Sequence, residues 1–246
     1  MSKAIVLSIP IDAISMQETL QKVESAITSK KQIHHTVVNA GKIVLMQTDK
    51  KLEKSVLDAD IINADGEAVV WAANFLGQRL PERVPGIDLM EELVKRSFEK
   101  GYKCFFLGAT EEVVTKLVNI YKAQYSEDII AGYRNGYFEK EDEEQIAIQI
   151  AESGADILFV AITSPKKEIF LTTYKKQLQN VNLIMGVGGS FDVISGKVKR
   201  APLWMQDVGL EWFYRFLQEP RRMWKRYLVG NSKFIWLVFK AYLKNK

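Results

Sequence analysis

The sequence is poor in cysteine and histidine, and it has no long apolar run. It contains one cysteine, Cys104, and two histidines, His34 and His35. A single cysteine cannot form a disulfide within the chain, which fits a reducing cytoplasm. No stretch approaches the roughly 18 apolar residues of a transmembrane helix, and the first ten residues lack the basic and apolar regions of a signal peptide. We therefore expect a cytoplasmic chain that does not cross a membrane.

Several short catalytic motifs are also missing. No Walker A loop, HExxH, paired CxxC or GxSxG element occurs, which argues against the common nucleotidases, zinc hydrolases and esterases. The two histidines have no cysteine or acidic cluster at metal-ligand spacing, so we expect them at the surface. Asp58-Ala59-Asp60 matches the metal-binding DxD pattern. It leads from a polar helix into a strand, however, and we expect solvated carboxylates there and no metal site.

Charge is distributed unevenly along the chain. The formal net charge is +4, yet residues 197–246 contain twelve Lys or Arg and three Asp or Glu. This last fifth also holds four of the five tryptophans, which are Trp204, Trp212, Trp224 and Trp236. Cations mixed with aromatics suit an anionic membrane surface, nucleic acid, or a helix packed on the core with a solvated basic face. Of the three, we favour the membrane surface.

Strand and helix signals alternate through most of the chain. Short apolar runs are separated by segments with apolar residues at helical spacing, which is typical of a parallel sheet covered by helices. After Pro202 the strand signals stop. We expect an α/β, Rossmann-like three-layer core with a mostly parallel sheet over residues 1–203, and a helical, basic, aromatic appendage over residues 204–246. The predicted strands cover residues 4–9, 35–38, 60–63, 103–107, 128–133, 157–161 and 183–187.

Polar and glycine-rich residues follow three of these strands. Ligands of open α/β sheets collect at the carboxyl ends of the strands. Asn39 comes directly after a predicted strand, Asp65 comes two residues after another, and Gly188-Gly189-Ser190 follow the last one. Exposed amides at a glycine-rich turn can bind phosphate, but this turn lacks the GxGxxG spacing of a dinucleotide site. Taken alone, it is equally well a tight strand-to-helix turn.

Asp65 has two interpretations. An Asp between a strand and a helix is often an N-cap that accepts hydrogen bonds from the first free amides of the helix. At the carboxyl end of a strand, the same residue could act as a general base that takes a proton from a hydroxyl nucleophile. The local sequence alone slightly favours the cap.

Seven stretches spread over the chain belong to one recognisable series. They are NADGEAVVWA, LPERVPGIDLM, FFLGAT, NGYF, ADILFVAITSPKKE, GVGGSFDVISGKVKRAP and GLEWFYRFLQEPRR. Together they closely resemble the WecG/TagA/CpsF glycosyltransferases, glycosyltransferase family 26. The resemblance covers nearly the whole chain, and the series GGSFD, GKVKRAP, LEW and EP is highly specific.

The resemblance implies an activity. The chain would be an inverting, metal-independent transferase that moves a hexose-type sugar from a UDP donor to a polyprenyl-diphosphate-linked sugar in bacterial cell-surface polysaccharide synthesis. The sugar would be N-acetylmannosamine, its uronic acid or another hexose. No cofactor and no nucleic acid are expected. The enzyme would lie peripherally on the inner face of the cell membrane, and the resemblance allows for a homo-oligomer.

The resemblance also implies roles for individual residues. Asp65 falls on the family's proposed catalytic base, and Asn39 matches a polar position near the sugar. Without a metal, amides and cations must stabilise the leaving diphosphate, and the appendage supplies Arg215, Arg221 and Arg222 for this task. Further substrate contacts are expected from Thr36, Arg83, Gly108, Tyr137, Lys167, Gly188, Gly189, Ser190 and Asp192.

Two positions depart from the family pattern. Val37 stands where members commonly have Thr, so a hydroxyl is missing unless Thr36 replaces it through a one-residue shift of the backbone. Lys167 stands where many members have Gln, and its cation would contact a phosphate or a uronic carboxylate, or face solvent. These departures mean that UDP-N-acetylmannosamine should not be assumed as the donor.

Alternative functions remain open at this stage. A Rossmann-like epimerase or reductase would bind NAD, and the missing fingerprint argues against it. A non-enzymatic, nucleotide-binding membrane adaptor would use the basic aromatic tail, but it gives no reason for Asp65, Asn39 and the GGSFD turn to occur together. A teichoic-acid-specific N-acetylmannosaminyltransferase is a narrower form of the main hypothesis.

Overall fold

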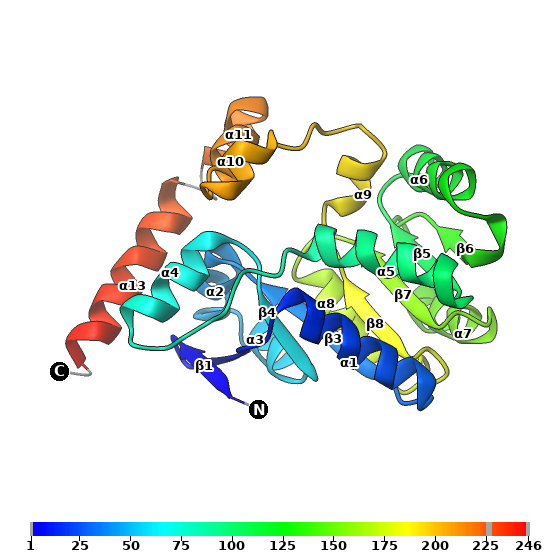
Figure 1. Ribbon diagram of the computed structural model, residues 1–246, viewed down its shortest axis with the longest axis horizontal. Coiled ribbons are helices and arrows are strands. Elements are labelled where there is room, and N and C mark those ends of the chain that lie inside the picture. The colour runs from blue at the N-terminus through cyan, green and yellow to red at the C-terminus, as the bar shows by residue number, and fades with distance from the viewer. Residues whose placement is uncertain (1, 225–227, 245–246) are drawn as a thin grey trace.

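A computed structural model describes residues 2–224 and 228–244 of the chain. Its main sheet has six strands in the order β4-β3-β8-β7-β5-β6, and every neighbouring pair is parallel. The predicted α/β, Rossmann-like class is confirmed (Figure 1). The strands are β3 (Ile33–Val38), β4 (Ile61–Ala64), β5 (Cys104–Gly108), β6 (Ile130–Arg134), β7 (Ile157–Ala161) and β8 (Leu183–Gly186).

The first predicted strand does not belong to this sheet. Residues 4–9 instead contain most of β1 (Lys3–Val6), the turn and the first residue of β2 (Ile9–Asp12), and the two strands form an antiparallel hairpin. The turn residues Leu7 and Ser8 both have positive φ, 50° and 71°, as two-residue hairpin turns require. The sequence gives little warning of this turn because neither residue is the Gly, Asn or Asp that usually marks one.

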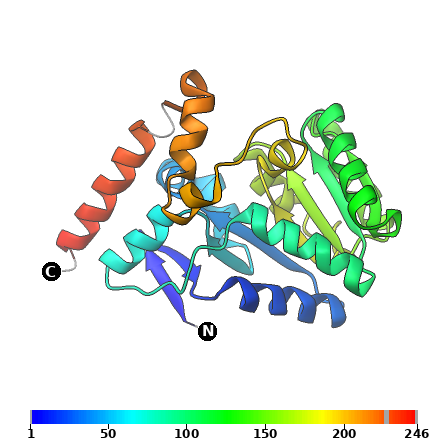
Figure 2. The same ribbon diagram turned by 45° about the horizontal axis from the view of Figure 1, so that its top comes forward.

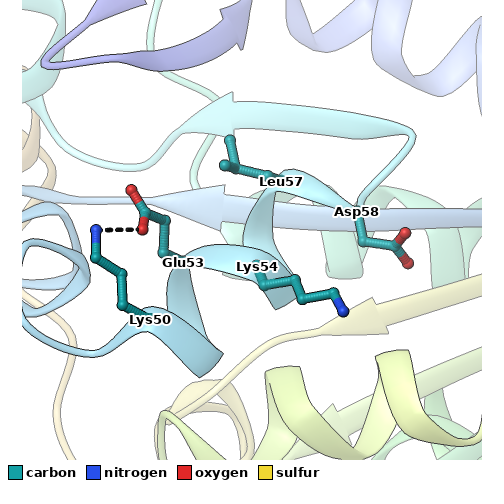
Figure 3. A pocket seen from close by; sticks show the side chains of 5 residues that line it. All are labelled: Lys50, Glu53, Lys54, Leu57 and Asp58. Atoms are coloured by element: carbon teal, nitrogen blue, oxygen red, sulfur yellow. Dashed lines mark hydrogen bonds and ion pairs between the residues drawn. The ribbon is translucent and has the colours of Figure 1, made fainter.

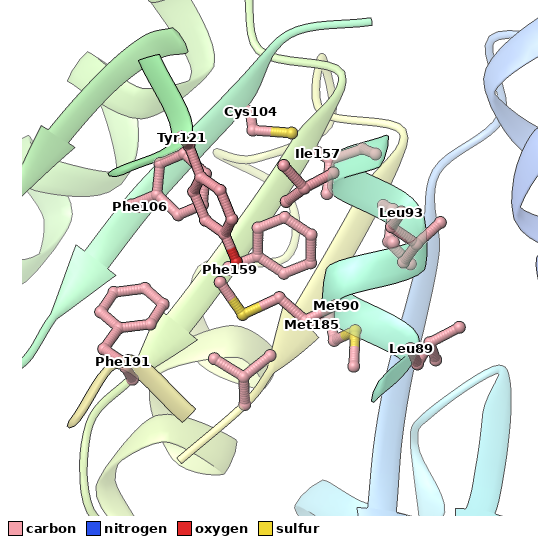
Figure 4. Packing of buried hydrophobic residues seen from close by; sticks show 14 of the residues in the cluster. Leu89, Met90, Leu93, Cys104, Phe106, Tyr121, Ile157, Phe159, Met185 and Phe191 are labelled. Carbon is pink, nitrogen blue, oxygen red and sulfur yellow. The ribbon is translucent and has the colours of Figure 1, made fainter. Parts of the chain in front are cut away.

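Helices cover both faces of the sheet. Phe106 and Phe159 pack with residues of α1, α5, α6 and α9 in one buried cluster (Figure 4). Their neighbours Phe105 and Leu158 pack with α7 and α8 in another. Successive side chains of a strand point to opposite faces, so these two clusters lie on opposite sides of the sheet and make three layers. The covering helices are α1 (Met16–Thr28), α2 (Ala40–Met46), α3 (Lys50–Leu57), α4 (Glu67–Phe75), α5 (Gly86–Lys100), α6 (Glu111–Gln124), α7 (Glu143–Glu152), α8 (Lys166–Thr173) and α9 (Ser190–Ile194).

The two histidines are buried, and their predicted surface position is wrong. His34 is 1% exposed and His35 is fully buried, because β3 is an internal strand between β4 and β8 and both of its faces are covered. Burial lowers the pKa of His34 to about 3 and that of His35 to about 4. The Nε2 atom of His35 lies 2.9 Å from Asn63 Oδ1 on β4. Both histidines are therefore neutral parts of the core at neutral pH.

Most of the described residues after Pro202 are helical, as predicted. They form α10 (Leu203–Asp207), α11 (Glu211–Gln218), α12 (Pro220–Trp224) and α13 (Gly230–Lys244). Along α13, Phe234 and Val238 are buried in the same cluster as residues of α2 and α4, and α13 lies beside these helices in both views (Figures 1 and 2). Ile235, Trp236 and Phe239 are exposed. Within residues 2–224 and 228–244, no helix is both long and apolar enough to cross a membrane.

Candidate active site at the carboxyl edge of the sheet

The parallel sheet gathers the predicted site residues at one edge. Asn39 follows β3, Asp65 follows β4, and the glycine turn follows β8. Because β3 lies between β4 and β8, Asp65 and the turn are separated by two strand spacings, roughly 10 Å in all. Carboxyl ends of parallel strands are where ligands of such sheets bind.

Asp65 is not the N-cap residue of the helix that follows it. The N-cap of α4 is Gly66, which has no side chain to accept a hydrogen bond from that end of the helix. Gly66 has φ of 116°, a conformation that favours glycine. The backbone amide of Asp65 donates to the carbonyl of Val38 at 2.8 Å, which ties the residue to the end of β3. The N-cap interpretation of Asp65 is wrong, and its half-buried carboxyl group stands at the edge where ligands bind.

Asn39 is the residue that caps a helix. Its Oδ1 accepts a hydrogen bond from the amide of Lys42 at 3.0 Å and begins α2. The side-chain oxygen is therefore used within the protein. The amide nitrogen of Asn39 and the second lone pair of its oxygen are the groups left for a substrate contact.

Thr36 does not replace the hydroxyl that is missing at Val37. The β3–β4 ladder pairs Thr36 with Ile62 and Val37 with Asn63 without a register shift. Adjacent side chains of a strand point to opposite faces, so Thr36 lies on the other side of the sheet from Val37. Thr36 is 2% exposed. A methyl group built on Gly86 would lie 3.6 Å from Val37, so Val37 packs against the start of α5.

Lys167 belongs to a buried ionic cluster, an arrangement that the sequence did not suggest. Its Nζ contacts the carboxylate of Glu168, which also pairs with Lys42 Nζ at 2.7 Å. All three residues are less than 9% exposed. Burial alone would raise the pKa of Glu168, but the two ammonium groups outweigh it and lower that pKa to about 2. Lys42 also donates to the carbonyl of Val37 at 2.6 Å. The cluster thus joins α2, α8 and the end of β3 below the site.

The aliphatic part of the Lys167 side chain also packs against the end of β8. A methyl group on Gly186, the last residue of β8, would come within 3.1 Å of Lys167 Cδ and Cε. Any larger residue at position 186 would therefore require the Lys167 side chain to shift by a few tenths of an ångström. Lys167 is directed into the protein and is 5% exposed, so it does not face solvent.

The glycine turn meets an arginine of the appendage. A methyl group built on Gly189 would come within 2.9 Å of Arg215 Nη2, so the guanidinium lies directly against the backbone of this turn. Gly188 has φ of 57° and open space around its Cα. Arg215 comes from α11, more than twenty residues further along the chain. The structure therefore brings together a glycine turn and a cation that are separate in the sequence.

Ser190 and Asp192 are engaged within their own segment. The Ser190 hydroxyl donates to the carbonyl of Val187 at 2.8 Å, and Ser190 is 6% exposed. Asp192 pairs with Lys197 at 3.3 Å. The contacts of both side chains stabilise the turn and the short helix after β8.

Arg83 is a contact between core and appendage. Its Nη2 donates to the carbonyl of Gln206 at 3.1 Å, and its Nη1 lies 3.6 Å from Glu211 Oε2. Arg200 also contacts Glu211, at 3.6 Å, and pairs with Asp88 at 2.6 Å. Sequence reasoning missed Glu211 and Arg200, although both lie in stretches of the motif series.

A cleft of about 430 Å³ lies next to Arg83. It borders α4 directly after the Asp65-Gly66 pair, and the appendage approaches its rim, since a methyl group on Gly209 would lie 2.9 Å from Glu67 Cβ. The lining residues are Met16, Glu67, Val70, Pro81, Glu82, Arg83, Pro85 and Asp88. The cleft provides a mixed polar and apolar surface, and its lining residue Glu67 follows Asp65 by two positions in the chain.

The remaining predicted residues lie on β5, after β6 and on α12. Gly108 ends β5 with φ of 138°, and a methyl group there would come within 2.5 Å of the Ala161 backbone. Tyr137 follows β6 and is 75% exposed. Arg221 is exposed on α12, and the side chain of Arg222 lies outside the described part of the chain. Among the described residues, no contact joins Gly108, Tyr137 or Arg221 to Arg215.

A second hollow, of about 380 Å³, lies away from this edge on α3 (Figure 3). It is lined by Lys50, Glu53, Lys54, Leu57 and Asp58. Asp58 and Asp60 precede β4, at the opposite edge of the sheet from Asp65, and both pair with Lys175, at 3.7 and 3.4 Å. The DxD sequence is therefore remote from the site, and its two carboxylates share one lysine.

Comparisons with known proteins point to one family. A model of the Glycosyl transferase WecG/TagA/CpsF family matches residues 4–246. A Bacillus subtilis protein named N-acetylglucosaminyldiphosphoundecaprenol N-acetyl-beta-D-mannosaminyltransferase is 39% identical over 188 residues, which cover 76% of this chain and 71% of the relative. A Bacillus spizizenii protein of the same name is 36% identical over 190 residues, covering 77% of this chain and 72% of the relative.

Proposed function

Because the chain belongs to the WecG/TagA/CpsF glycosyltransferase family, we propose that it transfers a hexose-type sugar from a UDP donor to a polyprenyl-diphosphate-linked sugar. The proposal includes inversion at the anomeric carbon and independence from a metal ion. Both relatives are named for transfer to a diphosphoundecaprenol-linked sugar, which supports the acceptor class. The observation that carries the proposal is the contact of Arg215 with the Gly189 turn.

The donor diphosphate binds at the glycine turn. Backbone amides there and the Arg215 guanidinium supply hydrogen-bond donors and positive charge, which the leaving diphosphate needs as its bond to the sugar breaks. Arginine suits this task because its planar fork pairs with two phosphate oxygens. The stabilisation grows in the transition state, where negative charge accumulates on the leaving group.

Asp65 acts as the general base for the acceptor hydroxyl. An inverting displacement needs the nucleophile and the leaving group on opposite sides of the anomeric carbon. The separation of roughly 10 Å between the ends of β4 and β8 leaves room for a hexose between Asp65 and the diphosphate. The cleft lined by Glu67 and Arg83 begins two residues after Asp65 in the chain and receives the acceptor sugar.

The appendage brings the site to the lipid-linked acceptor. Its exposed apolar side chains include Trp204, Leu217 and Trp236, and residues 197–246 carry twelve Lys or Arg. Aromatic side chains at headgroup depth and cations near lipid phosphates favour an anionic membrane surface. The peripheral position on the inner face of the cell membrane, the division at residues 203/204 and association into a homo-oligomer remain predictions.

A screen of UDP-sugars tests the proposal. Purified protein is incubated with each UDP-sugar and a short-chain prenyl-diphosphate-linked sugar, with and without EDTA, and the product is analysed by mass spectrometry and for anomeric configuration. We expect transfer from at least one UDP-hexose, unchanged by EDTA, with inversion. UDP-N-acetylmannosamine and its uronic acid belong in the panel with other hexoses, because Val37 and Lys167 depart from the family pattern. Absence of transfer from every donor, or retention of configuration, would contradict the proposal.

A further inference from the structure

Glu211 connects the appendage to two separate segments of the core. It is the first residue of α11. Its Oε2 lies 3.6 Å from Arg83 Nη1, and its Oε1 lies 3.6 Å from Arg200 Nε. Arg83 belongs to the connection between α4 and α5, whereas Arg200 follows α9. One carboxylate thus receives an arginine on each oxygen.

The two arginines are themselves fixed to the rest of the protein. Arg200 pairs with Asp88 of α5 at 2.6 Å, and Arg83 donates to the carbonyl of Gln206 at 3.1 Å. Side-chain exposures of 20%, 22% and 34% for Arg83, Arg200 and Glu211 mean that water only partly screens these pairs. Ion pairs organised into a network contribute more than isolated surface pairs.

Glu211 also lies on the same side of α11 as Arg215. Residues four apart are neighbours on one face of a helix, and Arg215 is one turn beyond Glu211. The face that Glu211 holds against the core is therefore the face that carries Arg215 to within 2.9 Å of a methyl position on Gly189. The turn before α11 is close to the core as well, since Gly209 approaches Glu67 Cβ.

We propose that Glu211 is a positioning residue: its ion pairs with Arg83 and Arg200 orient α11 so that Arg215 stands over the glycine turn. This inference rests on the proposed function for the role of Arg215. Glu211 itself touches no substrate. Loss of its charge frees α11 to rotate or separate from the core, and Arg215 then leaves the diphosphate site.

Amide hydrogen exchange in the substrate-free protein tests the structural half of this proposal. Glu211→Gln keeps the size of the side chain and removes its charge, and we expect α11 and residues 186–190 to exchange roughly three- to tenfold faster. Gln218→Ala is the matched control, because it removes a neutral hydrogen bond from α11 to the Lys199 carbonyl. We expect wild-type exchange in that variant. Equal exchange in Glu211→Gln and wild type would overturn the proposal.

Salt provides a second measurement on the unmodified protein. Partly exposed ion pairs are screened at high ionic strength, so exchange in α11 should rise between 0.05 and 1 M NaCl in wild type. It should change little in Glu211→Gln. Salt-independent exchange in wild type would overturn the proposal even if the variant failed to fold.

A double-mutant cycle tests whether Glu211 acts through Arg215. We expect Glu211→Gln to lower kcat/KM for transfer roughly tenfold in the wild-type background and less than twofold in an Arg215→Ala background. Equal losses in both backgrounds would refute the positioning role. If wild type transferred no sugar from any UDP donor, the proposed function would fail, and the exchange experiments would still decide whether Glu211 holds the appendage.

Discussion

At the scale of single residues, the turn after β8 uses glycine in two different ways. Gly188 adopts φ of 57°, a left-handed conformation that costs other residues about 1–2 kcal/mol. Gly189 has an ordinary φ of −81°, and its lack of a side chain instead makes room for Arg215. Substitution by alanine therefore has a different physical consequence at each position.

The first prediction compares these two glycines. Gly189→Ala should leave the free energy of unfolding within about 0.5 kcal/mol of wild type, because the obstructing atom is the end of a flexible side chain that can move. It should nevertheless lower kcat for transfer roughly 10- to 100-fold, because Arg215 is displaced from the leaving diphosphate.

Gly188→Ala is the matched variant. Its main effect should be a lower free energy of unfolding, caused by backbone strain, and its effect on kcat should be smaller than that of Gly189→Ala. Urea unfolding and steady-state kinetics measure the two effects. Normal transfer by Gly189→Ala would show that Arg215 does not stabilise the leaving diphosphate at this turn.

The second prediction concerns pH and the buried histidines. Burial holds the pKa of His34 at about 3 in the folded chain, whereas the unfolded chain takes up the proton near pH 6.5. The unfolded state therefore binds more protons below pH 6.5. Stability is complete above that pH and falls as the pH decreases toward the folded pKa.

Between pH 6.5 and 5, His34 alone should cost about 1.5 kcal/mol of the free energy of unfolding. His34→Leu should remove this loss, since neither ring nitrogen has a hydrogen-bond partner among the described residues. Urea titrations at the two pH values measure it, with Thr36→Val, a buried non-titrating change on the same strand, as the control. An unchanged loss in His34→Leu would contradict the assignment.

Sequence reasoning placed several residues correctly and could not determine their contacts. Asp65, Asn39 and the glycine turn reach the carboxyl edge because strand ends are visible in the sequence. Which of Asp65 and Asn39 caps a helix was not visible, since both follow a strand directly and both residue types cap well. In the structure Asn39 is the N-cap of α2, whereas Asp65 is not an N-cap because Gly66 lies between it and α4.

At the scale of elements, helices α2 and α8 are joined by the ionic cluster of Lys42, Lys167 and Glu168. Removing one partner of a buried ion pair leaves an uncompensated charge, which is strongly destabilising. The three positions are not equivalent, because Glu168 is shared by both lysines.

The third prediction follows from this sharing. Glu168→Gln should lower the free energy of unfolding by about 3–5 kcal/mol, since two ammonium groups lose their partner. Lys167→Gln should cost less, about 1–2 kcal/mol, because Lys42 still pairs with Glu168. Chemical denaturation at pH 7 compares the two variants. An equal cost for both would show that Glu168 depends on Lys167 alone.

The pattern of apolar residues predicted where strands occur better than it predicted which strands pair. Six of the predicted strands lie in the sheet within a few residues of their expected bounds, since apolar runs mark buried parallel strands. The seventh belongs to the β1–β2 hairpin, which depends on positive φ at Leu7 and Ser8. No local sequence signal identifies such a turn when the residues are not Gly, Asn or Asp.

At the scale of the whole molecule, helix α13 has two different faces. Phe234 and Val238 are buried against α2 and α4, whereas Ile235 and Trp236 are exposed. From the sequence, packing of this segment on the core and its contact with a membrane were alternative interpretations. An amphipathic helix can pack on the core with one face and leave the other face exposed. The exposed face is the part available for lipid.

The fourth prediction tests this face. Trp236→Ala should weaken sedimentation with anionic vesicles roughly tenfold, and binding should fall as salt rises. Phe98→Ala removes an aromatic side chain of similar exposure from α5 and serves as the matched control. Binding that is equal in the two variants, or independent of salt, would contradict an electrostatic and aromatic contact through the appendage.

The joining of core and appendage is the feature that the sequence could least reveal. A basic tail was evident, and the motif series brought its arginines into the predicted site. The contact between Arg215 and Gly189, and the ion pairs of Glu211 with Arg83 and Arg200, depend on how α11 docks. Such tertiary contacts leave no periodic signal in a single sequence.

The central claim is that Asp65 is the base of a glycosyl transfer at the carboxyl edge of the sheet. The most direct measurement is the single-turnover rate of transfer by Asp65→Asn, combined with calorimetric titration of UDP. Asparagine preserves size and would cap a helix as well as aspartate. We predict a loss in rate of roughly 10²–10⁴-fold with UDP affinity within about threefold of wild type. Near-normal turnover by Asp65→Asn would contradict the account.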